Sequence, residues 1–192
     1  KDILGFPLTH TNNGWLNLSG SEYVDCGSSS VLDDIFEGGG TIECWIYPTG
    51  NTADTGMMNK TASSGDGWSL RFDAFSSETW HLQFFAKHAS TNAVQQKNNI
   101  ISPNVWAHIV VTYDHASGNK STLYKNGSAL GSLDTDTASS GAYGTDVSRS
   151  LIIGKRFGND TSMFQGSIDE VKVYNKILST AEITKNYKHG LS

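Results

Sequence analysis

Hydrophobic and polar residues alternate along much of this chain with a period of two, which is the pattern of strands that bury one face. In the stretch TIECWIYP (41–48), Ile42, Cys44 and Ile46 alternate with Glu43 and Trp45. One side of this strand therefore suits a core, and the other side carries a mixture of aromatic and polar groups. The same alternation predicts strands within 68–74, 81–87, 106–114, 121–131, 150–156 and 167–175.

Turn-forming residues separate these stretches. Gly, Ser, Thr, Asn and Asp dominate the intervening segments, and Asn126–Gly127 is a strong signal for a two-residue β-hairpin. A single helix is expected near the C-terminus, with Ser179 or Thr180 as its N-cap and Gly190 at its end. Many short strands, frequent turns and one terminal helical turn predict an all-β fold. We expect a two-sheet antiparallel sandwich in which residues 1–192 form a single domain.

Composition and charge exclude several classes of function. The formal net charge is −5, whereas nucleic-acid binding needs a basic surface. The chain has no run of about 18 apolar residues, so membrane insertion is not expected. For Cys26 and Cys44 two free buried thiols are the favoured interpretation, and a disulfide between neighbouring strands is the alternative. Because the chain starts at Lys1 rather than at methionine, we expect a mature product or a domain excised from a larger protein.

Six segments, in their order along the chain, resemble the laminin-G-like branch of the concanavalin A-like lectin/glucanase superfamily. They are YVDCG (23–27), GTIECWIYP (40–48), NVWAHIVVTYD (104–114), LYKNGSALG (123–131), LIIGKRF (151–157) and FQGSIDEVKVYNKILSTAEI (164–183). The resemblance spans roughly residues 15–187 and implies a jelly roll of two curved antiparallel sheets. In such domains the concave sheet often presents a glycan-binding surface. The domain usually serves as a binding module of a larger secreted or surface protein.

The segment 167–175 raises the question of a metal ion. Alternation places Asp169 on the same side as Val171 and Val173, where a charge is costly unless it is paired. A hard cation with oxygen ligands would pair it, and the resemblance implies a structural calcium ion held by an aspartate at this place. Asp169 is therefore the main candidate ligand, and Asp25 and Asn13 are weaker ones. The alternative is that Asp169 caps a turn or accepts backbone N–H groups at a bulge, without an ion.

An enzyme is not expected, and no catalytic residues are assigned. The resemblance implies that a glucanase would carry carboxylates at alternating positions, close to E-x-D-x-x-E, and this chain has no such motif. Asp169 and Glu170 are adjacent, so on a regular strand they point to opposite faces and cannot form the carboxylate pair of glycoside hydrolysis. The spacings H-x-x-x-H and G-x-S-x-G are also absent from the sequence.

Sugar recognition needs aromatic platforms for the ring faces and planar polar groups for the hydroxyls. The outward positions of the predicted strands, which we expect to share one sheet, supply both: Trp45, Tyr47, Arg71, His81, Gln83 and Phe85. Loop residues that could surround them are Asn59, Lys60, Asp66, Trp80 and Asn159. Trp68 and Trp106 resemble packing residues of such domains and are assigned to the core instead.

Together these observations predict a non-catalytic, lectin-like carbohydrate-binding module. Its expected partner is a polysaccharide or surface glycan, bound on the concave sheet or the rim loops, and other domains of a parent protein are further expected partners. Calcium is the expected cofactor. An extracellular or surface-associated location follows from this function. The alternative is a structural or adhesive laminin-G-like domain of a cell-surface, fibre or virion protein that mediates protein–protein contact.

Overall fold

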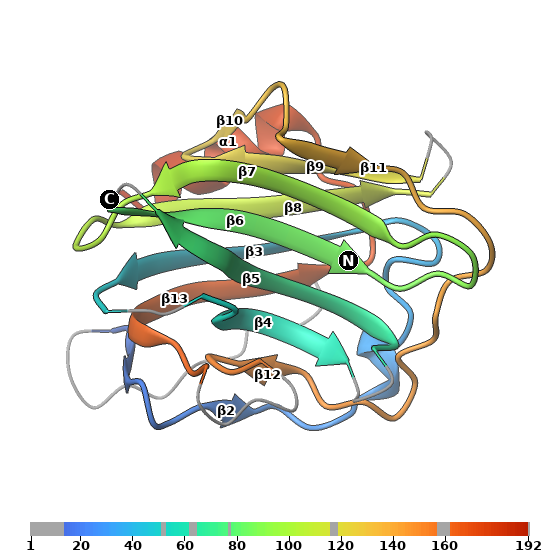
Figure 1. Ribbon diagram of the computed structural model, residues 1–192, viewed down its shortest axis with the longest axis horizontal. Coiled ribbons are helices and arrows are strands. Elements are labelled where there is room, and N and C mark those ends of the chain that lie inside the picture. The colour runs from blue at the N-terminus through green and yellow to red at the C-terminus, as the bar shows by residue number, and fades with distance from the viewer. Residues whose placement is uncertain are drawn as a thin grey trace.

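The computed structural model describes residues 14–50, 53–61, 65–76, 78–115, 119–156 and 162–191. Two antiparallel sheets pack face to face, as the sequence predicted, and Figure 1 shows one in front of the other. The six-stranded sheet has the order β1 (Leu16–Ser19), β13 (Gln165–Tyr174), β3 (Gly40–Pro48), β8 (Ala107–Asp114), β9 (Lys120–Lys125) and β10 (Ser128–Ala129). The seven-stranded sheet has the order β11 (Thr135–Thr137), β7 (Ala93–Ile101), β6 (Thr79–Ala86), β5 (Gly67–Ser76), β4 (Gly56–Thr61), β12 (Ile152–Ile153) and β2 (Val24–Asp25). A 3-10 turn η1 (Ser30–Leu32) and a helix α1 (Thr180–His189) complete the described elements.

The core lies between the sheets and is built by the predicted alternation. On β6, Leu82, Phe84 and Ala86 are fully buried, so the residues between them face outward. Both cysteines are free thiols, as the favoured interpretation held, but only Cys44 is buried in the core and Cys26 is partly exposed. Burial raises the pKa of the Cys44 thiol to about 12, so this group remains protonated and unreactive at neutral pH.

Helix α1 begins with a capping box, in agreement with the sequence-based expectation. The Ser179 hydroxyl accepts a hydrogen bond from the backbone N–H of Glu182, and the Glu182 carboxylate accepts one from the backbone N–H of Ser179. Such a cap stabilises a helix by about 1 kcal/mol. Ile183 is buried in a small apolar cluster with Val110 and Tyr124. The helix therefore lies on the outer face of the six-stranded sheet.

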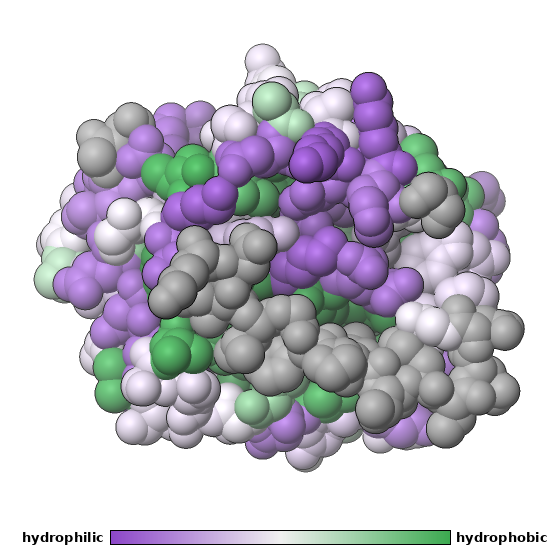
Figure 2. All heavy atoms as spheres, turned by 180° about the vertical axis from the view of Figure 1, so that it is seen from behind, coloured by the Kyte–Doolittle hydropathy of each residue, from purple (hydrophilic) through white to green (hydrophobic). Residues whose placement is uncertain are grey.

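The outer side of α1 is polar. Figure 2 shows the molecule from behind, where hydrophilic side chains gather over the region of the helix. Lys185 and Lys188 are exposed there. None of the helices in the described ranges is both long and apolar enough to cross a membrane.

A buried carboxylate, Glu43, fastens α1 to the sheet. Its side chain is 1% exposed and accepts hydrogen bonds from Asn186 of the helix at 2.8 Å and from Lys172 at 3.2 Å. The Nε2 atom of His108 lies 3.7 Å from a Glu43 oxygen. Burial alone would raise the pKa of Glu43, but His108, Asn186 and Lys172 together hold it below its ordinary value of 4.5.

A pH-dependent loss of stability follows from this lowered pKa. Ionised Glu43 stabilises the fold fully above pH 4.5, which is the ordinary pKa of the group. This stabilisation disappears as the pH falls through the lower pKa that Glu43 has in the folded state. We expect Glu43→Gln to lower the free energy of unfolding by about 1–3 kcal/mol at neutral pH. In urea unfolding the difference from the wild type should shrink at acid pH. The exposed Glu37→Gln is the control, and a pH-independent Glu43→Gln effect would contradict the assignment.

Candidate functional site

The outer face of the seven-stranded sheet carries two rows of side chains that run across the strands. Arg71, Gln83 and Gln96 lie opposite one another on β5, β6 and β7, followed by Thr135 on β11, and we call these four residues the polar row. The next row toward the other end of the strands contains Ser69, Phe85, Val94 and Thr137, and we call it the Phe85 row. The strand register therefore places planar polar groups directly beside an aromatic ring.

Hydrogen bonds fix the orientation of the polar row. Arg71 Nε donates to Gln83 Oε1 at 3.0 Å, and Gln83 Nε2 donates to Gln96 Oε1 at 2.5 Å. Gln96 Nε2 then donates to Asn98 Oδ1 at 2.8 Å. Gln83 is only 6% exposed and holds the row together, so the groups open to a ligand hydroxyl belong to the partly exposed members Arg71, Gln96 and Thr135. The row is a preorganised set of hydrogen-bonding groups.

Acidic side chains flank the Arg71 end of the row. The Arg71 guanidinium lies 3.6 Å from a carboxylate oxygen of Asp54 and 3.6 Å from one of Asp73. Arg156 binds the other oxygen of Asp54 at 2.6 Å. Burial lowers the pKa of Arg71, and the charge of Arg156 lowers it further. The two arginines thus share Asp54.

The polar face continues toward β7 through His81. Its Nε2 atom lies 3.1 Å from Asn99 Oδ1, and its Nδ1 atom lies 3.5 Å from the Gln96 amide nitrogen. Of the predicted ligand-binding residues, Arg71, His81, Gln83 and Phe85 are therefore brought together on one face. Their common side was correctly predicted from alternation.

The prediction that Trp45 and Tyr47 share this sheet is wrong. Both belong to β3, which pairs with β13 and β8 in the other sheet. Trp45 is 7% exposed because α1 covers it, and its ring stacks on Tyr187 with the centroids 5.6 Å apart. A covered ring cannot serve as a platform for a sugar.

Tyr47 lies in a separate aromatic group. Its ring centroid is 5.5 Å from that of Trp106, which in turn is 5.8 Å from that of Trp15. Trp106 is only partly buried, so its assignment to the core is wrong, whereas that of Trp68 is confirmed. This aromatic group lies on the opposite sheet from the polar row and offers a comparison surface for experiments.

Two other predicted contact residues are part of the interior. Trp80 is 2% exposed and stacks on Phe72 with a centroid distance of 5.2 Å. Asn59 is fully buried, and its amide donates to the backbone carbonyl of Lys155. Both corrections have the same cause, because these residues lie in strands rather than in rim loops. Asp66 is partly buried in its loop, and Asn159 lies outside the described residues.

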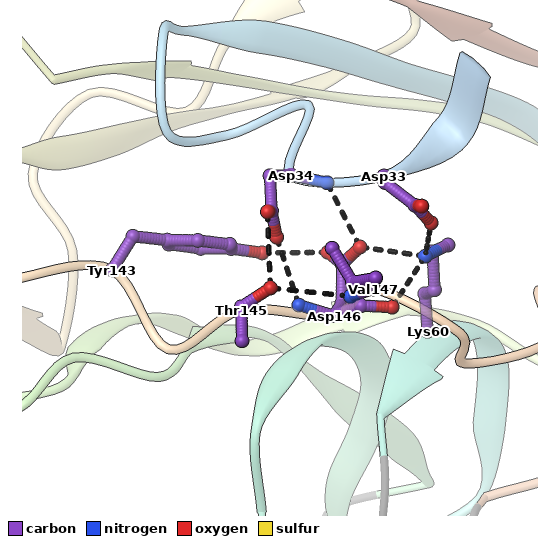
Figure 3. Close-up of polar contacts among 7 residues, drawn as sticks. All are labelled: Asp33, Asp34, Lys60, Tyr143, Thr145, Asp146 and Val147. Atoms are coloured by element: carbon purple, nitrogen blue, oxygen red, sulfur yellow. Dashed lines mark hydrogen bonds and ion pairs between the residues drawn. The ribbon is translucent and has the colours of Figure 1, made fainter. Parts of the chain in front are cut away.

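Lys60, also predicted on the rim, is the centre of a buried ion-pair cluster (Figure 3). Its ammonium lies 2.6 Å from Asp33 Oδ1, from Asp146 Oδ1 and from the Asp146 backbone carbonyl. The backbone N–H of Asp34 and the hydroxyl of Tyr143 donate to the Asp146 carboxylate at 2.9 Å each. Burial raises the pKa of Asp146, although Lys60 opposes this shift. The cluster connects β4 to two loops in the interior of the protein.

The predicted calcium ligands are only partly described. A β-bulge between Asp169 and Lys172 shifts the alternation of β13, so Asp169 pairs with Trp45 rather than pointing inward with Val171. The expectation of a buried Asp169 is therefore wrong, and Asp169 Oδ1 accepts the backbone N–H of Glu170 at 2.7 Å, which is the backbone contact at a bulge that the sequence offered as an alternative. Asp25 lies on β2 of the other sheet and accepts the backbone N–H of Gly27. Asn13 is outside the described residues.

No group of three or more His, Cys, Asp or Glu side chains that could hold a metal ion is found within the described ranges. Calcium takes about 6–8 oxygen ligands. Asp169 therefore fits such an ion only with oxygen ligands of other kinds, such as backbone carbonyls.

Strand β7 was not predicted, so its contribution to the face was missed. Gln96, Asn98 and Asn99 come from the segment AVQQKNNI, which shows no apolar alternation. Gln95 takes a buried inward position because its oxygen accepts from Ser121 and its nitrogen donates to the Thr137 carbonyl. A satisfied buried amide replaced the apolar residue that would have marked the strand.

Comparisons with known proteins agree with this fold. Residues 18–184 match the laminin-G-like family described as the concanavalin A-like lectin/glucanases superfamily. The chain belongs to this superfamily. No curated protein sequence matches it.

Solved structures from several organisms share this fold with the chain. The sialidase CBM40 of Ruminococcus gnavus, bound to α2,3-sialyllactose, has a TM-score of 0.67 at 16% identity and covers 91% of this chain and 97% of its own. Domain 4 of the Geobacillus stearothermophilus arabinanase AbnA, in complex with arabinotriose, has a TM-score of 0.64 at 16% identity. The match covers 89% of this chain and 75% of the AbnA chain. A SAP-like pentraxin of Limulus polyphemus has a TM-score of 0.61 at 15% identity. The match covers 93% of this chain and 78% of the pentraxin chain.

Proposed function

We propose that this domain is a non-catalytic carbohydrate-binding module whose ligand lies on the outer face of the seven-stranded sheet. The observation that carries the proposal is the hydrogen-bonded polar row beside Phe85. Planar amides and a guanidinium match the donors and acceptors of sugar hydroxyls, and the phenyl ring matches the apolar face of a sugar. Neighbouring structures that bind sialyllactose and arabinotriose support a carbohydrate partner.

The proposal excludes hydrolysis at this face. The acids beside the polar row, Asp54 and Asp73, both lie 3.6 Å from the Arg71 guanidinium. A glycosidase needs two carboxyl groups that are available to act on the glycosidic bond, whereas both of these acids are engaged by a cation. We therefore infer a binding role, in which the domain holds a secreted or surface-associated parent protein on a glycan.

Affinity electrophoresis in gels containing individual polysaccharides tests this function. At least one glycan should retard the wild type, and Gln83→Ala combined with Gln96→Ala should weaken binding by about tenfold or more, because each lost hydrogen bond contributes roughly 1 kcal/mol. Trp106→Ala, on the opposite sheet, is the control and should bind as the wild type does. Binding lost only in Trp106→Ala would place the site on the other face. Retardation by no glycan would favour the adhesive protein-binding alternative.

A structural calcium ion is a separate proposal that rests on the sequence. If Asp169 and backbone carbonyls hold calcium, added calcium raises the melting temperature and exhaustive chelation lowers it, because a ligand that binds only the folded state stabilises it. Differential scanning fluorimetry with elemental analysis measures this. The variant Asp169→Asn should abolish the calcium-dependent shift. An unchanged melting curve in a protein free of metal would contradict the proposal.

A further inference from the structure

We propose that the ligand is an uncharged, linear glycan chain that crosses β5, β6 and β7 along the polar row, rather than an acidic sugar held by Arg71. This inference rests on the proposed function and specifies the chemistry and the orientation of the ligand. It follows from the pairing of charges on the face and from the direction of the row.

The first argument concerns charge at the Arg71 end of the row. Arg71 lies between Asp54 and Asp73, and Arg156 binds Asp54. Two cations therefore face two anions at this end. A carboxylate or sulfate on the ligand would have to displace an existing acid, and in doing so would leave that acid without its partner.

A further cation at the edge of the sheet is also paired, although Lys97 lies opposite the inward Leu82 and therefore alternates with the polar row. Lys97 lies 3.6 Å from Asp134, whose other contacts include the backbone N–H of Asn98 at 2.8 Å. The internal segments outside the described residues, 51–52, 62–64, 77, 116–118 and 157–161, contain no lysine or arginine. They cannot supply an additional positive charge to an acidic ligand.

Among the described residues, Lys87 is a further cation that follows a strand of this face. Lys87 comes directly after β6 and two residues beyond Phe85. Along the strand, the Phe85 row therefore lies between Lys87 and Gln83. An acidic ligand bound there would lie beyond the polar row instead of along it. Lys87 therefore provides a direct test of the two ligand chemistries.

The second argument concerns direction. Neighbouring strands lie about 4.8 Å apart, so the polar row from β5 to β11 crosses three spacings and is about 14 Å long. That length exceeds a single sugar ring, and hydrogen-bonding groups recur at each strand from Arg71 to Thr135. The Phe85 row runs parallel to it. A continuous pair of rows suits consecutive units of a chain better than one terminal residue.

Matched glycans separate the outcomes in isothermal titration calorimetry. The neutral probes are linear arabinan, xylan, galactomannan, lactose and carboxyl-reduced polygalacturonate, and the acidic probes are sialyllactose and native polygalacturonate. We expect a neutral polymer to bind, with affinity rising as its oligosaccharides lengthen from one unit to several. The acidic member of a pair should bind about tenfold more weakly than its neutral counterpart. Binding should change less than about twofold when salt rises from about 50 to about 500 mM.

Variants complete the test. Gln83→Ala with Gln96→Ala should lose binding to the neutral chain, and Lys87→Gln should retain it. The inference would be overturned if sialyllactose or native polygalacturonate bound more tightly than its neutral counterpart, and if that binding were lost in Lys87→Gln or depended strongly on salt. A carbohydrate-binding role would remain in that case. A monosaccharide that binds as tightly as its oligomers would overturn the chain orientation. If no glycan of either class binds, the proposed function fails and this inference fails with it.

Discussion

Replacing Lys60 with methionine is expected to lower the free energy of unfolding by about 3–5 kcal/mol. The ammonium is fully buried and is the cation that lies against the carboxylates of Asp33 and Asp146. Methionine fills a similar volume but leaves the Asp146 charge in the interior without compensation. The measurement is equilibrium unfolding in urea, followed by tryptophan fluorescence.

Lys120→Met is the matched control for this loss. Lys120 also forms a lysine–aspartate pair, with Asp136 at 2.8 Å, but both side chains are more than 40% exposed. An exposed pair contributes about 0–1 kcal/mol, so this variant should be nearly as stable as the wild type. The Lys60→Met defect should also be smaller at acid pH, since burial already raises the pKa of Asp146 and protonation removes its charge. Equal effects of the two variants would contradict the buried cluster.

Trp80→Ala is expected to destabilise the fold by about 3–5 kcal/mol. The indole is buried and stacks on Phe72 at an interplanar angle of 18°, so truncation leaves a large cavity between the sheets. Thermal unfolding should show the loss, and Trp80→Phe should restore most of the stability. Glycan binding by the Trp80→Phe variant should be unchanged, because the polar row does not include this residue.

The opposite pattern would restore the sequence-based prediction of a contact role for Trp80. A stable Trp80→Ala variant that no longer binds glycan would mean that the indole reaches the ligand. Phe85→Ala is the comparison, because Phe85 faces outward from the same strand. It should weaken binding while costing less stability than Trp80→Ala.

Local alternation predicted much of the sandwich. It identified the strands that became β3, β5, β6, β8, β9 and β13, and the capping signal at Ser179 identified α1. Both rest on interactions within a few residues of the chain, which a single sequence records directly. The polar strand β7 was missed because its inward amide, Gln95, is satisfied by hydrogen bonds to β9 and β11 rather than by apolar packing.

The site could be predicted only in part, because it depends on long-range pairing. Alternation correctly placed Arg71, His81, Gln83 and Phe85 on one side of their strands, but it could not show that β3 joins the other sheet. Tyr187 stacks on Trp45, although the two residues are far apart in the sequence. The bulge that turns Asp169 away from Val171 follows from the register of β13 against β3. Such features arise from tertiary packing and leave no local signal.

The most direct test of the account is a nuclear magnetic resonance titration of the labelled domain with the neutral oligosaccharide that binds best. If the outer face of the seven-stranded sheet is the site, the side-chain amide signals of Gln83 and Gln96 shift with ligand concentration, and the indole signals of Trp45 and Trp106 stay unchanged. Shifts confined to Trp15 and Trp106, with silent glutamine amides, would contradict it.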